Sequence, residues 1–242
     1  MGITLLATSD IHSPRYLDIY LKLLKTVDWS KIDVIVWAGD LVEKNNISAL
    51  KPAYEKTLSL SQGKPIVAVF GNEEYHEYEE EYMRRYEQVI WLKDNYVILE
   101  IKGSKIGFIG TRGALEKPTL WQSKNMPWLS KYYEELPAKI KELATKIRSE
   151  VDYLVLVSHY GVTYRNLRGE KPYVWPYLAS KRMEKIITPD LFDAVIHGHA
   201  HNARVEKVLV NNVPVYNVSL PAFNKLFEIV IGGKKGLLQW LG

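Results

Sequence analysis

The stretch ITLLATSDIHSP, residues 3–14, contains the pattern that decides the fold. Residues 3–8 are a short apolar run, which is typical of a strand buried on both faces. Asp10 and His12, two side chains that can bind a metal ion, follow the run directly. Ligands bind beyond the carboxyl ends of strands in open α/β sheets, so the stretch predicts a strand that ends at a site. Ser13 and Pro14 then have the character of an N-cap and a first-turn proline, which predicts a helix starting there.

The same arrangement recurs four times further along the chain. Each apolar run ends in residues that can bind a metal: Gly39-Asp40 after 33–37, Gly71-Asn72-Glu73 after 66–70, Ser158-His159 after 153–157, and Gly198-His199-Ala200-His201 after 193–196. We expect the glycines to allow the unusual backbone angles of tight turns. Two cations ~3.5–4 Å apart share a ligand shell in many hydrolases. The chain supplies seven donors for such a pair: Asp10, His12, Asp40, Asn72, His159, His199 and His201.

The remaining periodicity places helices and hairpins around these strands. Helical spacing continues to Val27 after the first strand and recurs over 47–60, 77–90 and 134–149. Hairpins are predicted for 96–101 with 105–109 and for 205–210 with 213–218, and 226–231 is predicted to be the last strand. This order predicts sheets with helices outside them, and the length favours a single domain over residues 1–242.

Composition narrows the function. The chain has 242 residues, no cysteine and a formal net charge of +4. Disulfides and thiolate-held metals are therefore excluded, and imidazole, carboxylate and amide donors suit Mn, Fe, Co, Ni or Zn. The mild positive charge is compatible with a phosphate-bearing substrate, and no long Lys/Arg tract favours nucleic acid.

The location of the protein is expected to be the cytoplasm. No signal-peptide pattern precedes the first strand, and no apolar run approaches the ~20 residues that span a bilayer, so a membrane protein is not expected. Many Lys, Glu, Ile and Tyr residues with few Gln hint at a thermophile source.

In order and spacing, the five motifs resemble those of the calcineurin-like metallophosphoesterase family, whose signature is D-x-H, GD, GN, a lone His and GH-x-H. The resemblance implies an α/β (α+β) fold, a four-layer sandwich of two facing mixed β-sheets flanked by helices. It implies a dinuclear metal centre with one cation on Asp10, His12 and His201, the other on Asn72, His159 and His199, and Asp40 bridging. The implied activity is hydrolysis of phosphate esters, as a phosphodiesterase or phosphatase with a metal-bound hydroxide as nucleophile.

One departure from the family pattern concerns the catalytic residues. The family usually places a His directly after the Asn, where it protonates the leaving oxygen or stabilises phosphate charge, and here the position is Glu73. A glutamate serves as an acid only if its pKa is raised. His76 lies near in sequence and is the alternative donor. If neither Glu73 nor His76 donates a proton, diesters or esters with a good leaving group are the favoured substrates. The catalytic candidates are therefore these two residues together with Asp40 and Asn72.

The segment 160–182 directly follows His159 and is expected to overhang the site. Tyr160, Arg165 and Arg168 are its substrate-binding candidates together with Asn72, since cations bind phosphate and rings stack on flat groups. A solvated face is the alternative for this segment. Aromatic residues between 121 and 133 are either core or the contact of a homo-oligomer. His197 is expected in the core or supporting a metal ligand.

Three functions remain open at this point. A small-molecule phosphate ester is the leading substrate. A nuclease of the same fold is the second alternative, and it would need a longer basic groove to bind the phosphates of nucleic acid. A non-catalytic metal-binding scaffold or interaction protein is the third alternative, although such a protein has no reason to keep all seven donors.

Overall fold

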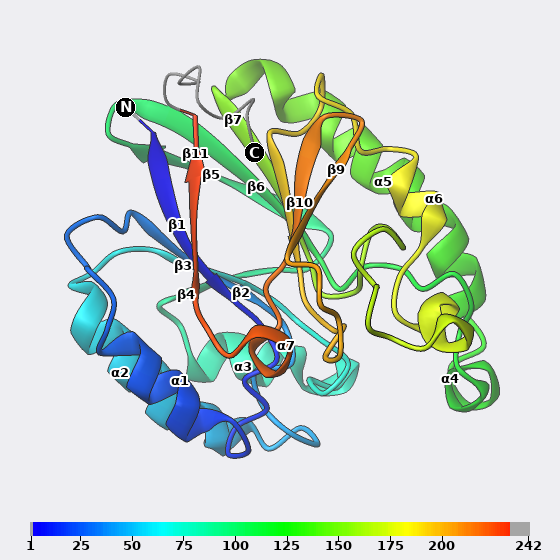
Figure 1. Ribbon diagram of the computed structural model, residues 1–242, viewed down its shortest axis with the longest axis horizontal. Helices are drawn as coiled ribbons and strands as arrows, with labels where there is room; N and C mark the ends of the chain where they lie inside the picture. Colours follow the sequence, from blue (N-terminus) through cyan, green and yellow to red (C-terminus); the bar gives the residue numbers. More distant parts are fainter. Residues whose placement is uncertain (1, 233–242) are drawn as a thin grey trace.

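The computed structural model describes residues 2–232, in which two mixed β-sheets pack face to face between helices (Figure 1). The first sheet has the order β11-β1-β2-β3-β4, with β1 to β4 parallel and β11 antiparallel to β1. Its strands are β1 (Ile3–Thr8), β2 (Val34–Ala38), β3 (Ile66–Val69), β4 (Val89–Leu92) and β11 (Phe227–Ile231).

The second sheet has the order β5-β6-β7-β8-β10-β9. Its four central strands are parallel, and the edge strands β5 and β9 are each antiparallel to their neighbour. The strands are β5 (Asn95–Ile101), β6 (Ser104–Thr111), β7 (Tyr153–Ser158), β8 (Ala194–His197), β9 (Lys207–Val210) and β10 (Val213–Asn217). The parallel strands of both sheets therefore present their carboxyl ends to the connecting loops where the candidate ligands lie.

Helices cover the outer faces of both sheets. The α-helices are α1 (Leu17–Leu24), α2 (Lys51–Ser61), α3 (Glu79–Arg85), α4 (Leu120–Asn125), α5 (Leu129–Ile147), α6 (Lys181–Glu184) and α7 (Leu220–Phe223). Short 3-10 helices span Ile47–Leu50, His76–Tyr78, Arg148–Glu150 and Pro172–Tyr177. Helices α1, α2 and α3 pack on the first sheet, and α5 and α6 pack on the second (Figure 1). No helix of the described chain combines the length and apolar character needed to cross a membrane.

Three separate apolar clusters fill the spaces between the layers. In β1, Leu5 and Ala7 face the cluster between the sheets, whereas Leu6 faces the cluster beneath α1 and α2. A third cluster lies between the second sheet and α5. Because strands with helices on one face and a sheet on the other are buried on both sides, they read as unbroken apolar runs. The predicted four-layer α/β sandwich of two mixed sheets is confirmed.

The predicted strands are confirmed to within a few residues, but two helix predictions are wrong in part. The first helix begins at Leu17 and not after Pro14. Ser13 is held in the loop instead, because its backbone N–H donates to the Leu41 carbonyl over 2.9 Å and its hydroxyl donates to the Ala49 carbonyl. Its side chain is therefore not available as a helix cap.

The helix predicted over 77–90 ends at Arg85. Its expected last turn lies instead in β4, where Val89 pairs with Ile66 and Trp91 pairs with Ala68. Apolar residues at this point fit either a helical stripe or a sheet strand, and pairing with β3 decides the outcome. The predicted single domain also includes residues 1 and 233–242, which lie outside the described residues.

Candidate metal centre

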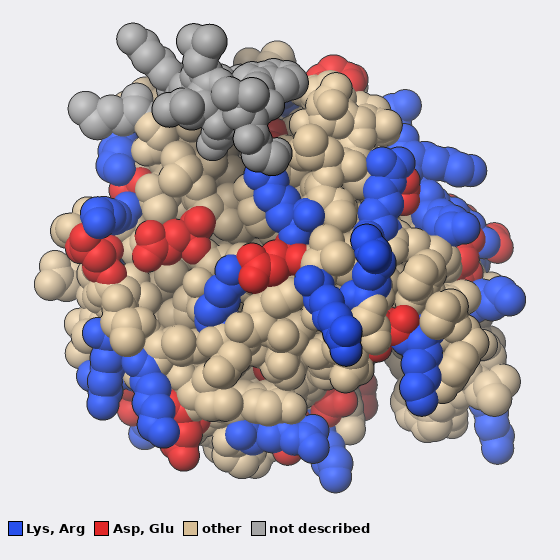
Figure 2. Space-filling view, viewed as in Figure 1, with Lys and Arg blue, Asp and Glu red and all other residues tan. Residues whose placement is uncertain are grey.

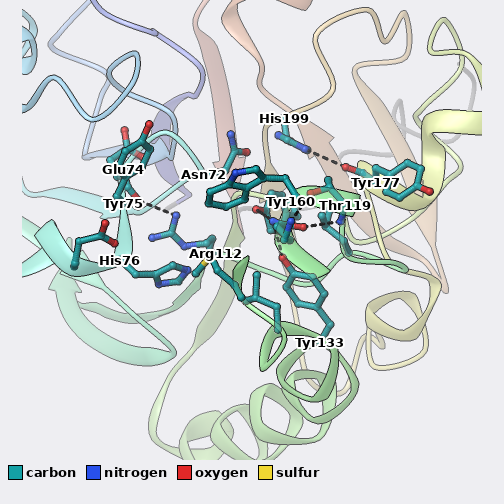
Figure 3. A pocket seen from close by; sticks show the side chains of 16 residues that line it. Asn72, Glu74, Tyr75, His76, Arg112, Thr119, Tyr133, Tyr160, Tyr177 and His199 are labelled. Atoms are coloured by element: carbon teal, nitrogen blue, oxygen red, sulfur yellow. Dashed lines mark hydrogen bonds between the residues drawn. The ribbon is translucent and has the colours of Figure 1, made fainter. Parts of the chain in front are cut away.

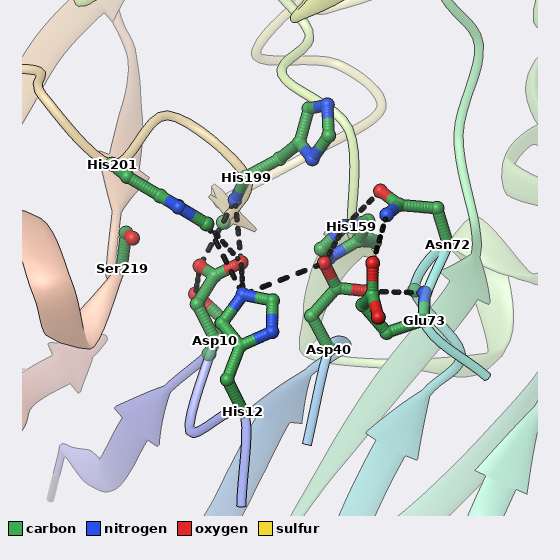
Figure 4. Close-up of polar contacts among 12 residues, drawn as sticks. Asp10, His12, Asp40, Asn72, Glu73, His159, His199, His201 and Ser219 are labelled. Carbon is green, nitrogen blue, oxygen red and sulfur yellow. Dashed lines mark hydrogen bonds and ion pairs between the residues drawn. The ribbon is translucent and has the colours of Figure 1, made fainter. Parts of the chain in front are cut away.

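Seven polar side chains from both sheets meet at the carboxyl ends of five strands (Figure 4). Asp10 and His12 follow β1, Asp40 follows β2, and Asn72 follows β3. His159 follows β7 in the second sheet, and His199 and His201 follow β8. Side chains separated by nearly two hundred positions are thus gathered where the two sheets face each other.

Asp10, His12 and His201 form the first of two donor groups. One donor atom from each lies within 4.8 Å of the others. The His201 Nε2 is 3.0 Å from the Asp10 Oδ1, and the His12 Nε2 is 3.4 Å from the His201 Nε2. Two imidazoles and one carboxylate pointing at a shared volume are a donor set that suits a divalent transition metal.

Asp40, His159 and His199 form the second group, again within 4.8 Å of one another. The Asn72 Oδ1 adds a further donor 3.2 Å from the His159 Nε2. Asp40 lies between the two groups, because its Oδ2 is 3.3 Å from the His159 Nε2 and 3.7 Å from the His12 Nε2. The other Asp40 oxygen accepts the Glu73 backbone N–H over 2.8 Å, which fixes the carboxylate in this orientation.

The hydrogen bonds of His159 fit a cation at the second group. Its Nδ1–H donates to the Ala38 carbonyl over 2.9 Å, which turns the Nε2 towards the oxygens of Asn72 and Asp40. Burial opposes a charge on His159, but the Asp40 carboxylate raises the pKa of His159 to about 9, so without a metal the Nε2 carries a proton. A bound cation would take the place of that proton between the Nε2 and the two oxygens.

His199 repeats this arrangement from the other side. Its Nε2–H donates to the Tyr177 carbonyl over 3.3 Å. Its Nδ1 is buried and has no hydrogen-bond partner among the described residues. An unpaired buried nitrogen is costly unless a ligand satisfies it, so the donor chemistry of the group fits a bound metal.

The backbone at the centre is strained in the way that functional sites often are. Asp10, His12, Asp40 and His199 all have left-handed φ angles, of 58°, 41°, 50° and 69°. Such angles are costly for residues other than glycine and persist when the surroundings enforce them. Of the three expected turn glycines, only Gly39 has a positive φ. Gly71 and Gly198 are needed for a different reason, because a Cβ there would overlap Asp40 or Ser9.

The motifs and the fold agree with a comparison against protein families. The family model of the calcineurin-like phosphoesterases matches residues 3–203. The chain belongs to this family. It is therefore a hydrolase acting on phosphoester bonds, with two candidate His/Asp metal groups. No curated protein matches the chain in sequence.

Three solved structures share this fold with the chain at low sequence identity. Phosphopantetheinyl hydrolase from Mycobacterium tuberculosis superposes with a TM-score of 0.66 at 14% identity, over 94% of this chain and 96% of that one. The NAD nucleotidase of Haemophilus influenzae gives 0.56 at 16%, over 95% of this chain and 47% of the nucleotidase. GAP50, the anchor in the inner membrane complex of Plasmodium, gives 0.55 at 15%, over 91% and 72%. At these identities the likeness concerns the fold alone.

Glu74 is a buried residue of this phosphoesterase that sequence reasoning missed. Its two carboxylate oxygens accept four backbone N–H groups: Asp40 at 3.0 Å, Leu41 at 2.6 Å, Val42 at 3.2 Å and Gly71 at 2.6 Å. Burial, followed by the nearby Asp40 charge, raises the pKa of Glu74 to about 7. The side chain ties the loop after β2 to the loop after β3. No local pattern distinguishes it from a surface glutamate.

The charges of the centre favour ionised carboxylates. Burial alone would raise the pKa of Asp10, but His201, His159 and His12 hold that pKa well below its ordinary value. Burial opposes ionisation of Asp40 in the same way, and His159 lowers the pKa of Asp40. Burial, followed by repulsion from His159, lowers the pKa of His199 to about 3. Ionised carboxylates and a neutral imidazole are the forms that bind metals.

A cavity of about 540 Å³ opens beside the centre (Figure 3). Asn72, His199 and Tyr160 contribute to its wall. The rest of the lining comes from Tyr177 in the segment 160–182, from the segment 74–77, from Arg112, and from the chain between Leu115 and Tyr133. The aromatic residues expected to be core or an oligomer contact therefore include Trp121 and Tyr133, which face this space.

Of the three substrate-binding candidates in the segment 160–182, only Tyr160 lies at the cavity. Tyr160 lines the cavity, with its ring centroid 4.8 Å from that of His199. Arg165 and Arg168 are not part of the lining. The Arg165 guanidinium pairs with Glu184, at 2.8 Å from Nη2, because the segment folds back towards α6.

Glu73 and His76 have different surroundings. One Glu73 oxygen accepts the Lys44 backbone N–H over 2.6 Å. His76 lines the cavity, and its Nδ1 is 3.2 Å from the buried Glu79 carboxylate. His197 is fully buried and its Nε2 is 2.8 Å from the Asn166 amide nitrogen, which agrees with the expected core position.

Proposed function

We propose that this phosphoesterase hydrolyses a phosphate ester of a small molecule, as a phosphodiesterase or phosphatase with two divalent cations. The observation that carries the proposal is the pair of donor groups joined by Asp40 and opening through Asn72 and His199 into the cavity. When bound, two divalent cations lower the pKa of a water molecule and offset the charge of a phosphate.

The residues of the chain would bind the cations and orient the phosphate. Asp10, His12 and His201 would hold one cation, and Asn72, His159 and His199 would hold the other, with Asp40 shared. Asn72 also lines the cavity, so its amide can orient the phosphate. Glu73 supports this arrangement through its backbone N–H to Asp40. Catalysis in such a site is mostly positioning and electrostatic stabilisation.

His76 is the proton donor that we propose for the leaving oxygen. Glu73 already accepts a backbone N–H from Lys44, so its carboxylate is engaged in holding the loop. His76 faces the cavity, and Glu79 orients it through Nδ1, which leaves Nε2 to carry a proton. With a proton donor in the cavity, esters with a poor leaving group become substrates as well as diesters and activated esters.

A small molecule is favoured over nucleic acid as the substrate. Figure 2 shows Lys and Arg side chains gathered mainly on the right of one face, with some acidic side chains among them. Within residues 2–232, however, no lysine lines the cavity beside the metal centre, and its Arg112 is ion-paired to Glu79. Binding of nucleic acid depends on a row of phosphate contacts from Lys and Arg.

The test of the proposal measures hydrolysis of bis(4-nitrophenyl) phosphate and 4-nitrophenyl phosphate with Mn²⁺, Co²⁺, Ni²⁺ or Zn²⁺. We expect metal-dependent turnover, and we expect Asp40→Ala to lower kcat/KM by about 10²–10³-fold, as loss of one electrostatic group in an active site does. The control is Asp18→Ala, which changes an exposed carboxylate on α1. Full turnover by Asp40→Ala, or none by the wild-type protein with any of these ions, would refute the proposal.

The role of His76 is tested by the choice of leaving group. His76→Ala should lower kcat at least about tenfold on an alkyl ester, which needs a proton, and have little effect on 4-nitrophenyl esters. Glu73→Gln is the comparison and should affect both substrates alike, because its effect is on the loop. Equal loss on both substrates in His76→Ala would assign His76 to structure rather than proton transfer.

A further inference from the structure

The cavity beside the metal centre has two chemically different halves. Its polar half consists of Asn72, the segment 74–77 and Arg112. Its other half is mostly apolar and aromatic, and Thr119, Gln122 and His199 are its polar members. The apolar and aromatic residues are Leu115, Trp121, Met126, Leu129, Tyr133, Tyr160 and Tyr177. The volume of about 540 Å³ lies in the range of small-molecule pockets, roughly 300–1,000 Å³. A ligand that fills it therefore meets a polar end and an apolar end.

The apolar half is built as a fixed wall. Helix α4 begins with a capping box, in which the Thr119 hydroxyl accepts the Gln122 N–H and the Gln122 side chain accepts the Thr119 N–H. The Gln122 amide then reaches the Tyr133 hydroxyl over 3.2 Å and the Tyr160 hydroxyl over 3.5 Å. These contacts hold the start of α4, which carries Trp121, beside the cavity.

The wall is continuous with the metal centre. Tyr160 belongs to both, because its ring packs on Tyr133 with centroids 6.3 Å apart and on His199 with centroids 4.8 Å apart. A phosphate held near Asn72 and His199 would therefore have its substituent directed along Tyr160 into the apolar half (Figure 3).

The charges of the lining disfavour a second phosphate. The Arg112 guanidinium is already engaged, with Nη2 2.6 Å from the Glu79 Oε1 and Nη1 2.9 Å from the Glu74 carbonyl. Glu77 adds an exposed carboxyl group to the same half, and no lysine among residues 2–232 lines the cavity. A polyphosphate chain would thus meet the Glu77 carboxylate, whereas His76 and Arg112 are both paired with Glu79.

We propose that the apolar half binds an uncharged aromatic or other apolar substituent of the phosphate ester, and that Trp121 contributes to this selectivity. This rests on the proposed function, because it takes the phosphate to be at the metal centre. The substrate class is then a phosphate ester with one apolar organic group, as opposed to a nucleoside polyphosphate or a small polar ester.

Binding of phosphonates, which are not hydrolysed, tests this inference. Calorimetric titration of the protein in excess Mn²⁺ compares methylphosphonate with 1-naphthylphosphonate. We expect naphthylphosphonate to bind roughly 10- to 100-fold more tightly, the factor that corresponds to burying one aromatic side chain. Trp121→Ala should lower this ratio at least about fivefold, as removal of an aromatic contact does.

The matched control is Leu120→Ala, the neighbouring position on α4. Leu120 is 89% exposed and is not part of the lining, so its variant should keep the wild-type ratio. Trp121 is itself 65% exposed, so its replacement should leave the fold intact. Equal affinity for the two phosphonates, or an unchanged ratio in Trp121→Ala, would overturn the inference.

A parallel assay separates this inference from the proposed function. Hydrolysis of bis(4-nitrophenyl) phosphate without selectivity for naphthylphosphonate would overturn the inference and leave the proposed function in place. Trp121-dependent selectivity without turnover of any ester would support the apolar site and overturn the proposed function.

Discussion

Glu74 is the residue through which the loops at the metal centre are held together. It accepts N–H groups from the three consecutive residues 40–42 and from Gly71. Two of those loops carry Asp40 and Asn72, so one carboxylate positions donors of two strands. Buried N–H groups without a partner are costly, and one acceptor that serves four of them is hard to replace.

We therefore expect Glu74→Ala to lower the free energy of unfolding by about 3 kcal/mol or more, since it leaves several buried N–H groups unpaired. Glu74→Gln should cost less than Glu74→Ala because one acceptor oxygen remains. Urea denaturation monitored by tryptophan fluorescence measures both. Glu77→Ala is the control, as an exposed glutamate three positions on. A loss below about 1 kcal/mol in Glu74→Ala would show that the loops are held by other contacts.

At the scale of elements, the connection from β3 to α3 carries most of what is particular to this chain. It contains Asn72, Glu74 and His76, and it ends where Glu79 begins α3. Glu79 is 2% exposed and ion-paired to Arg112 and Lys93, each at 2.6 Å, as well as to His76 at 3.2 Å. The loops after β4 and β6 thus anchor the start of this helix through one carboxylate, together with His76 from the connection itself.

Because of these ion pairs, the contribution of Glu79 to the free energy of unfolding depends on pH. Burial by itself raises the pKa of Glu79, but His76, Lys93 and Arg112 together lower it from 4.5 to about 2. Because the folded pKa is the lower one, the stabilisation is complete above pH 4.5 and is lost as the pH falls towards 2.

Glu79→Gln should therefore be less stable than the wild-type protein at neutral pH, by up to about 3 kcal/mol from the shift alone. The difference should shrink as the pH falls from 4.5 towards 2. Unfolding free energies of both proteins across this range measure it, and Glu80→Gln is the exposed neighbour for comparison. A difference that does not depend on pH in this range would contradict the assignment.

At the scale of the whole molecule, the donors join the two sheets. Asp10, Asp40 and Asn72 come from the first sheet, and His159 and His199 come from the second. Bound cations would tie together two layers that otherwise meet through apolar side chains. Ligands that bind only the folded state stabilise it by mass action.

Metal addition should accordingly raise Tm. At a concentration about 100 times the Kd, one site adds ~2.7 kcal/mol, which corresponds to roughly 5–10 °C for a chain of this size. Differential scanning calorimetry with Mn²⁺ and then EDTA measures the shift. Asp40→Ala should show less than half of it, because Asp40 faces both donor groups. An unchanged Tm with every divalent ion would contradict a metal centre in the folded protein.

The sequence by itself determined the strands and the chemistry of the donors. A strand that is buried on both faces has an unbroken apolar sequence, whatever the rest of the fold is. Such a run followed by Asp, Asn or His can therefore be recognised from the local sequence. The ends of neighbouring parallel strands meet at one edge of a sheet, so Asp10, Asp40 and Asn72 could be expected near one another before any coordinates were known.

Only the tertiary structure decided which distant segments surround those donors. The segment after His159 turned Arg165 towards Glu184, while Trp121 and Tyr133 from another segment came to line the cavity. Glu74 became a buried acceptor, and residues 89–92 joined a sheet instead of extending a helix. The physical reason is that side-chain periodicity records only whether a residue is buried, whereas its partners depend on how the two sheets and their loops pack.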